Sequence, residues 1–164
     1  MTPAVGSRAP EFTARNQYGE EVRLADFRGH RDVVLVFYPY AFSGVCTSEL
    51  TTLRDRPALL AAAEFLAISC DPMFTLRAYS DAQKLEFGLL TDFWPHGAIA
   101  SSYGVFDSDR GCAVRGTFVV DRGGVIRWSV VNPIPEARNP DDYAEALASL
   151  GSISGRLRRR YEGE

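Results

Sequence analysis

Residues 33–38 place the strongest constraint on how this chain can fold. They read Val-Val-Leu-Val-Phe-Tyr, so nearly every side chain is apolar and is either β-branched or aromatic. A strand with apolar side chains on both faces is expected in the middle of a sheet that is covered on both sides. The chain then passes Pro39, Ser43 and Gly44 and reaches Cys46. The sequence therefore predicts a central strand that leads through a turn into a helix with a cysteine in its first turn.

Predicted strands and helices alternate along most of the chain. In chain order we expect short strands at 12–14 and 21–24, the central strand, a helix at 46–63 interrupted near Pro57, a strand at 64–70, a helix from an N-cap at Asp71 to about residue 85, a strand at 87–90, a short helix ending at Tyr103, strands at 114–120 and 125–131, and a helix at 141–150. This order is that of a thioredoxin-like sandwich, an α/β fold with a mixed β-sheet, helices on both faces and an N-terminal β-hairpin. In parallel βα units ligands bind beyond the carboxyl ends of the strands, where Cys46 is expected.

The length of 164 residues is typical of one domain. We expect that domain to cover residues 1–150 and a flexible basic tail to cover residues 151–164. A short stretch of Gly and Ser resembles a spacer, and four arginines follow it between residues 156 and 160. Solvation is the expected state of this tail, with nucleic-acid or membrane contact as the alternative.

Composition and charge exclude several classes of protein. The net charge of −3 is small and the acidic and basic residues are interspersed, so no nucleic-acid partner is expected. No apolar run approaches the ~20 residues that span a bilayer, and the first residues lack a charged start followed by an apolar stretch. We therefore expect a cytoplasmic protein without a membrane partner. The 3 cysteines and 2 histidines fit neither a disulfide framework nor a zinc site, so no metal and no cofactor are predicted.

Cys46 is the candidate nucleophile. The start of a helix offers exposed backbone N–H groups and the positive end of the helix dipole, and both favour a thiolate. A buried structural cysteine is the alternative interpretation. Ser43 lies three residues earlier, so its hydroxyl could donate to and accept from a substrate, or could cap the helix. Pro39 could shield the thiolate from water, or could only end the strand.

The spacing Pro39-x-x-x-Ser43-x-x-Cys46 resembles the active-site motif of the peroxiredoxins, Pro-x-x-x-Thr/Ser-x-x-Cys. Residues 92–98, Asp-Phe-Trp-Pro-His-Gly-Ala, and residues 115–121, Arg-Gly-Thr-Phe-Val-Val-Asp, resemble the AhpE-like one-cysteine subgroup, the actinobacterial type. The resemblance implies a thiol-dependent peroxidase that reduces hydrogen peroxide and organic hydroperoxides through a cysteine sulfenic acid.

The same resemblance assigns roles to two more residues. It implies that Arg115 holds the thiolate and the peroxide, and that the carboxylate of Glu49 orients Arg115. Without the resemblance, Arg115 is a solvated residue at a strand start and Glu49 is a favourable acid in the first turn of a helix. The family also implies an external thiol reductant (mycothiol, or a glutaredoxin-like or thioredoxin-like protein) and a homodimer. Ser43 stands where the commonest family pattern has Thr.

Two other functions are alternatives to the peroxidase. In a thioredoxin-like thiol-disulfide oxidoreductase, the first position of a Cys-x-x-Cys pair is the attacking thiol, and Ser43 occupies that position here. A noncatalytic redox-sensing module is disfavoured because Pro39, Ser43, Cys46 and Arg115 are all present.

The remaining cysteines decide how an oxidised Cys46 would be reduced. Small-hydrophobe packing is the expected role of Cys70. Cys112 lies three positions before Arg115, and in a regular strand the two side chains would point to opposite faces. Neither stands at a known resolving position, so a one-cysteine mechanism is predicted, with a resolving role left open. Phe93 and Trp94 are candidates for the rim of the site or a dimer contact.

Overall fold

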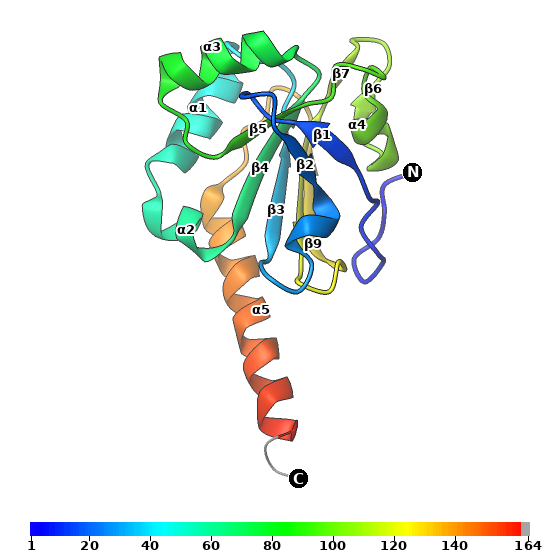
Figure 1. Ribbon diagram of the computed structural model, residues 1–164, viewed down its shortest axis with the longest axis vertical. Coiled ribbons are helices and arrows are strands. Elements are labelled where there is room, and N and C mark those ends of the chain that lie inside the picture. The colour runs from blue at the N-terminus through cyan, green and yellow to red at the C-terminus, as the bar shows by residue number, and fades with distance from the viewer. Residues whose placement is uncertain (162–164) are drawn as a thin grey trace.

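The computed structural model describes the main chain of residues 1–161 and the side chains of residues 1–151. A seven-stranded sheet with the order β2-β1-β5-β4-β3-β8-β9 runs through the molecule (Figure 1). Its strands are β1 (Thr13–Arg15), β2 (Glu21–Arg23), β3 (Val33–Phe37), β4 (Glu64–Ser69), β5 (Gly88–Thr91), β8 (Arg115–Val120) and β9 (Ile126–Asn132), and a second, two-stranded sheet consists of β6 (Phe106–Asp107) and β7 (Cys112–Ala113). The helices are α1 (Gly44–Arg54), α2 (Pro57–Ala62), α3 (Met73–Gln83), α4 (Ala98–Ser102) and α5 (Pro140–Tyr161), with a 3-10 helix η1 (Leu24–Phe27).

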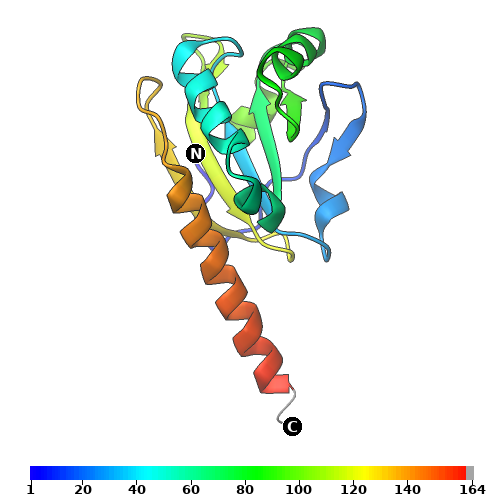
Figure 2. The ribbon, with the colours of Figure 1, turned by 90° about the vertical axis from the view of Figure 1, so that its left-hand side faces the viewer.

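β3 is the central strand that the sequence predicts. It pairs parallel with β4 and antiparallel with β8, and all of its residues are buried. Val34 and Val36 pack in a core with side chains of α1, α2, α3 and α5, whereas Val33, Leu35 and Phe37 pack on the opposite face with α4 and the N-terminal segment. Figure 2 shows α1, α2 and α5 together over one face of the sheet. The predicted α/β fold, a mixed sheet with helices on both faces, is confirmed.

Local signals predict some helix boundaries and miss others. The expected interruption near Pro57 is present, since α1 ends at Arg54 and α2 begins at Pro57. The N-cap predicted at Asp71 is wrong, because Pro72 is the N-cap and α3 begins at Met73. The carboxylate of Asp71 instead accepts hydrogen bonds from the main-chain N–H of Ala41 at 2.8 Å and from the hydroxyl of Ser69 at 2.7 Å. Asp71 therefore ties the end of β4 to the loop before α1.

The end of α5 also differs from the prediction. The sequence predicts that the last helix ends at residue 150, but α5 continues to Tyr161 and extends away from the sheet (Figures 1 and 2). The tail predicted from residue 151 is therefore helical as far as Tyr161, and its last residues, 162–164, lie outside the described part of the chain. None of the helices within residues 1–161 is long and apolar enough to cross a membrane.

Candidate active site

Cys46 is the third residue of α1, which begins directly after the loop that follows β3. Its side chain is fully buried, with 0% of its surface exposed. The first N–H groups of a helix lack partners within the helix, so a thiolate at this position lies among main-chain donors. Pro39, which precedes the loop, is buried as well. The sequence-predicted strand, turn and cysteine are thus brought together at the carboxyl end of the central strand.

Ser43 is the N-cap residue of α1, but its side chain does not cap the helix. Its Oγ donates a hydrogen bond to the carbonyl oxygen of Tyr40 at 3.0 Å. The hydroxyl proton is therefore directed into the loop, and the oxygen lone pairs remain as acceptors. The structure therefore lacks the side-chain cap that was one interpretation of Ser43, and the contact with a substrate stays a prediction.

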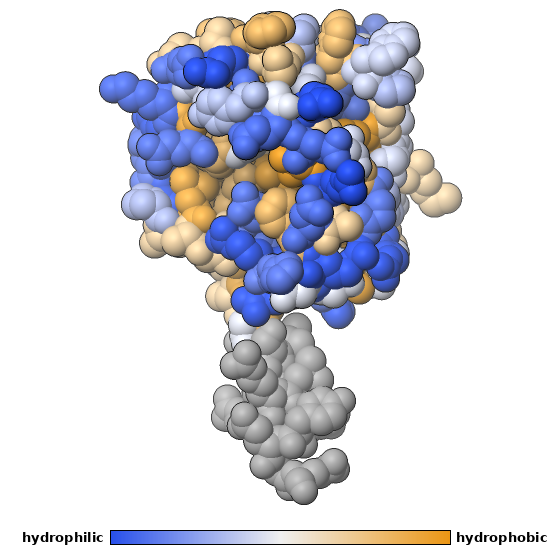
Figure 3. All heavy atoms as spheres, in the orientation of Figure 1, coloured by the Kyte–Doolittle hydropathy of each residue, from blue (hydrophilic) through white to orange (hydrophobic). Residues whose placement is uncertain are grey.

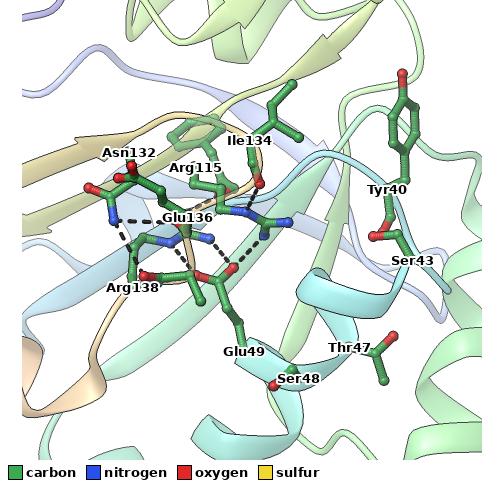
Figure 4. Close-up of polar contacts among 12 residues, drawn as sticks. Tyr40, Ser43, Thr47, Ser48, Glu49, Arg115, Asn132, Ile134, Glu136 and Arg138 are labelled. Atoms are coloured by element: carbon green, nitrogen blue, oxygen red, sulfur yellow. Dashed lines mark hydrogen bonds and ion pairs between the residues drawn. The ribbon is translucent and has the colours of Figure 1, made fainter.

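Arg115 and Glu49 form a buried ion pair, with side chains only 2% and 6% exposed. Nη1 of Arg115 donates to Oε1 of Glu49 at 2.6 Å, and Nε donates to the carbonyl oxygen of Ile134 at 2.5 Å (Figure 4). Within the described part of the chain, no hydrogen bond engages Nη2 of Arg115. Because Glu49 follows Cys46 by three residues in α1, the two side chains share one face of the helix. Glu49 therefore holds the guanidinium beside the face of α1 that carries the thiol.

Arg138 is a component of the site that sequence reasoning did not find. Its side chain is 1% exposed. It donates to both carboxylate oxygens of Glu49, with Nε to Oε2 at 2.9 Å and Nη2 to Oε1 at 2.8 Å. Its Nη1 donates to the carbonyl oxygens of Phe37 and Gly116 at 2.7 and 2.8 Å. The carboxylate of Glu49 is thus shared by two buried arginines. No local pattern in the sequence marks Arg138, since its acidic partner lies 89 residues away.

The electrostatics follow from this clustering of charge. Burial alone would raise the pKa of Glu49, but the hydrogen bonds and charge of Arg138, with the charge of Arg115, outweigh burial and lower it. Glu49 is therefore ionised at neutral pH. Burial raises the pKa of Tyr79 and outweighs the hydrogen bond with the Thr47 hydroxyl of α1, 2.9 Å away, which lowers it.

The two other cysteines lie in less reactive settings. Burial, followed by the charge of Asp92, raises the pKa of Cys70 to about 12. Burial also raises the pKa of Cys112. The assumption that Cys112 and Arg115 share one regular strand is wrong, because the chain leaves the strand conformation at Val114, between β7 and β8. The strand-face argument about Cys112 therefore does not apply.

Within the described residues, no group of three or more His, Cys, Asp or Glu side chains is arranged to hold a metal ion. The polar groups that the site does hold are a thiol, a hydroxyl, two guanidinium groups and one carboxylate. They form a set suited to stabilising negative charge on sulfur and oxygen. Fold and site together define a thioredoxin-like protein with a buried thiol at the start of α1, one turn before the carboxylate that holds the buried arginines.

Comparison with known proteins identifies the family. The model of the AhpC/TSA family matches residues 5–129. Alkyl hydroperoxide reductase E of Mycobacterium tuberculosis is 44% identical over 148 residues, covering 89% of this chain and 97% of that protein. The chloroplastic 2-Cys peroxiredoxin BAS1 of Hordeum vulgare is 33% identical, covering 90% of this chain and 75% of that protein. The crystal structure of Enterococcus faecalis AhpC superposes with a TM-score of 0.85 at 26% identity, covering 94% of this chain and 96% of that one.

The chain belongs to the AhpC/TSA family of peroxiredoxins. It is a thiol-dependent peroxidase, and the similarity to alkyl hydroperoxide reductase E supports the AhpE-like subgroup that the sequence motifs resemble. The thiol-disulfide oxidoreductase and the noncatalytic module are not favoured.

Proposed function

We propose that Cys46 is the peroxidatic nucleophile of this enzyme. Its thiolate attacks one oxygen of a peroxide, the O–O bond breaks, and the other oxygen leaves as water or an alcohol after taking up a proton. Cys46 becomes a sulfenic acid in this step. The observation that carries the proposal is the position of Cys46 in the first turn of α1, one turn before the carboxylate that holds Arg115.

Arg115 and Ser43 are assigned to the transition state. Negative charge moves from sulfur to the leaving oxygen during attack, and donors aimed at that charge lower the barrier. Nη2 of Arg115 is proposed to donate to the peroxide oxygens. The Ser43 Oγ, whose proton is directed at the Tyr40 carbonyl oxygen, is proposed to accept the hydrogen bond of the peroxide O–H. Glu49 fixes Arg115 through the 2.6 Å ion pair. Pro39 is proposed to exclude water from the thiolate.

A one-cysteine cycle follows for the second half of the reaction. The raised pKa values of Cys70 and Cys112 leave both as thiols at neutral pH, and thiols are poor nucleophiles toward a sulfenic acid. An external thiol is therefore proposed as the reductant, either a small thiol such as mycothiol or a glutaredoxin-like or thioredoxin-like protein. Such a cycle requires a compartment in which thiols stay reduced, which supports a cytoplasmic location.

Stopped-flow reaction of the reduced protein with hydrogen peroxide and with a fatty-acid hydroperoxide tests the assignment. Cys46→Ser should abolish peroxide consumption, because serine is not ionised near neutral pH. Cys70→Ala is the matched control and should react at the wild-type rate. A Cys46→Ser variant that keeps a tenth of the wild-type activity would show that the nucleophile is another residue.

We also propose that this protein forms a homodimer, in which its partner is a second copy of the chain. Large apolar side chains are exposed on the described part of the chain, including Phe42, Phe74, Phe93 and Trp94, the last with 83% of its surface in contact with solvent. Phe93 and Trp94 also line a cavity of about 580 Å³ with side chains of β1 and α4. Figure 3 shows an apolar area surrounded by hydrophilic side chains on the face turned toward the viewer. Exposed apolar patches of this kind commonly mark protein interfaces.

Sedimentation analysis tests the homodimer. Trp94→Ser should shift the protein toward the monomer, while Val131→Ser, which changes an exposed apolar side chain on β9, should leave the assembly as in the wild type. A wild-type protein that is monomeric at micromolar concentration would contradict the homodimer.

A further inference from the structure

The loop between β3 and α1 holds a conformation that its sequence does not favour. Phe42 has φ = +68°, the left-handed region that side chains larger than glycine rarely adopt. Residues held in such conformations persist only where the surrounding structure fixes them, and they are frequent at functional sites. The contacts that hold this loop therefore bear on the residue that follows it, Ser43.

Contacts to three separate parts of the fold hold the loop. At Ala41, the main-chain N–H donates to the carboxylate of Asp71 at 2.8 Å, just beyond β4. The Phe42 ring packs edge-on against Tyr79 of α3, with the ring centroids 4.9 Å apart. Tyr40, the residue before Ala41, makes the third contact. Its hydroxyl donates to the carbonyl oxygen of Arg110 at 3.0 Å, in the turn between β6 and β7.

The turn that accepts the Tyr40 hydrogen bond is itself well fixed. The side chain of Asp107 accepts a hydrogen bond from the main-chain N–H of Arg110 at 3.1 Å. The carbonyl oxygen of Asp107 accepts a hydrogen bond from the main-chain N–H of Gly111 at 2.8 Å. Nε2 of His96 lies 2.7 Å from the carbonyl oxygen of Gly111, which ties the turn to the loop before α4. The carbonyl oxygen of Arg110 is thus a fixed anchor point for Tyr40.

Tyr40 is also the residue whose main chain holds Ser43. The carbonyl oxygen of Tyr40 accepts the hydroxyl hydrogen bond of Ser43 at 3.0 Å and the main-chain N–H of Ser43 at 3.4 Å. We propose that Tyr40 is a positioning residue of the peroxidase, whose hydroxyl fixes the main chain that holds the Ser43 Oγ in place to accept a hydrogen bond from the substrate. This inference rests on the proposed role of Ser43 in contacting the peroxide.

The Tyr40 hydroxyl keeps its proton under working conditions. Its contact with the Cys112 thiol, followed by burial, raises the pKa of Tyr40 to about 12. The phenol is therefore a hydrogen-bond donor throughout the neutral pH range. Removing only the hydroxyl, as in Tyr40→Phe, deletes the anchor and leaves the ring. Since Tyr40 is 42% exposed, this change is compatible with folding.

A double-mutant cycle between Tyr40 and Ser43 tests the proposal. The second-order rate constant for hydrogen peroxide is measured by stopped flow for wild type, Tyr40→Phe, Ser43→Ala and the double variant. Tyr40→Phe should slow the reaction about fivefold, the effect of one ordinary hydrogen bond. In the Ser43→Ala background the same change should have no further effect, because the group that it positions is already absent.

Tyr18→Phe is the matched control, since it removes the hydroxyl of another exposed tyrosine, in the loop between β1 and β2. It should react at the wild-type rate. Wild-type kinetics for Tyr40→Phe, or an equal loss in the presence and absence of the Ser43 hydroxyl, would overturn the positioning role. If instead Cys46 were not the nucleophile, the wild-type protein and Cys46→Ser would consume peroxide at the same rate. This result is distinct from those that would overturn the role of Tyr40.

Discussion

Arg115 is an arginine with almost no exposed surface, and two of its three nitrogens are engaged with Glu49 and Ile134. Burying a guanidinium is costly unless its charge is paired and its hydrogen bonds are made. Glu49 supplies that pairing. The planar guanidinium is therefore fixed in one orientation, which a flexible lysine ammonium would not reproduce.

Arg115→Ala should slow the attack on hydrogen peroxide by about a hundredfold, as expected when a donor to the transition state is lost. A cysteine of ordinary pKa is fully ionised at pH 10, so at that pH any effect of Arg115 on ionisation disappears. Stopped-flow rates measured from pH 6 to pH 10 separate the two effects. A loss that vanishes at pH 10 would limit Arg115 to ionising the thiol, and Arg127→Ala, at an exposed position in β9, is the control.

Ser43 allows a comparison that isolates its hydroxyl. Ser43→Ala should slow peroxide attack at least about tenfold, because it removes the oxygen that is proposed to accept the hydrogen bond of the peroxide O–H. Ser43→Thr keeps the hydroxyl and should be nearly neutral. The same stopped-flow assay applies, with circular dichroism to verify the fold. Equal damage from both substitutions would indicate that packing, not hydrogen bonding, sets the requirement at this position.

At the scale of elements, Glu49 and Arg138 join parts of the chain that are far apart in sequence. Glu49 lies in α1, while Arg138 lies in the segment before α5 and contacts the ends of β3 and β8 through Phe37 and Gly116. These buried charge-assisted hydrogen bonds hold α1 against the sheet. The helix that carries the thiol is thus locked to the strand that carries Arg115.

Glu49→Gln should remove a pH-dependent part of the stability. The pKa of Glu49 is lowered below its ordinary value of 4.5, so its contribution is complete above that pH and is lost as the pH falls through the folded-state value. Urea unfolding should show that the wild type loses stability below about pH 4.5 more steeply than Glu49→Gln. At neutral pH the variant should be less stable by roughly 3 kcal/mol, because two buried arginines lose their counter-charge. Parallel pH profiles for the two proteins would exclude this role.

The sequence predicts the elements with strong local patterns and misses those that depend on distant contacts. The apolar run of β3 and the break at Pro57 can be recognised from neighbouring residues alone. The pair β6 and β7 has only two residues in each strand, too few for a pattern. Arg138 precedes Asn139 and Pro140 in a segment that resembles an exposed loop, and only the fold brings it to Glu49. The helix beyond residue 150 was missed because Gly151, Ser152, Ser154 and Gly155 are weak helix formers.

At the scale of the whole molecule, the three cysteines distinguish two reaction cycles. If Cys46 acts alone, one equivalent of peroxide without reductant should add about 16 Da to the intact mass, and excess peroxide about 32 Da or more. A resolving cysteine would instead lower the mass by about 2 Da through a disulfide. We expect the mass gain, with Cys70→Ala and Cys112→Ala each retaining turnover supported by an external thiol. A peptide that links Cys46 to Cys70 or Cys112, with loss of turnover in the matching variant, would establish a two-cysteine enzyme.

The buried ion network also determines what the enzyme attracts at each stage of its cycle. Arg115 and Arg138 bring two positive charges and Glu49 one negative charge, so the thiolate proposed to attack the peroxide brings the site to electrical neutrality. A neutral site suits an uncharged substrate such as a hydroperoxide. Once the sulfur becomes an uncharged sulfenic acid, one positive charge is left uncompensated in a region of low dielectric. The oxidised enzyme therefore favours an anion, and the thiolate of a reductant is the anion that completes its cycle.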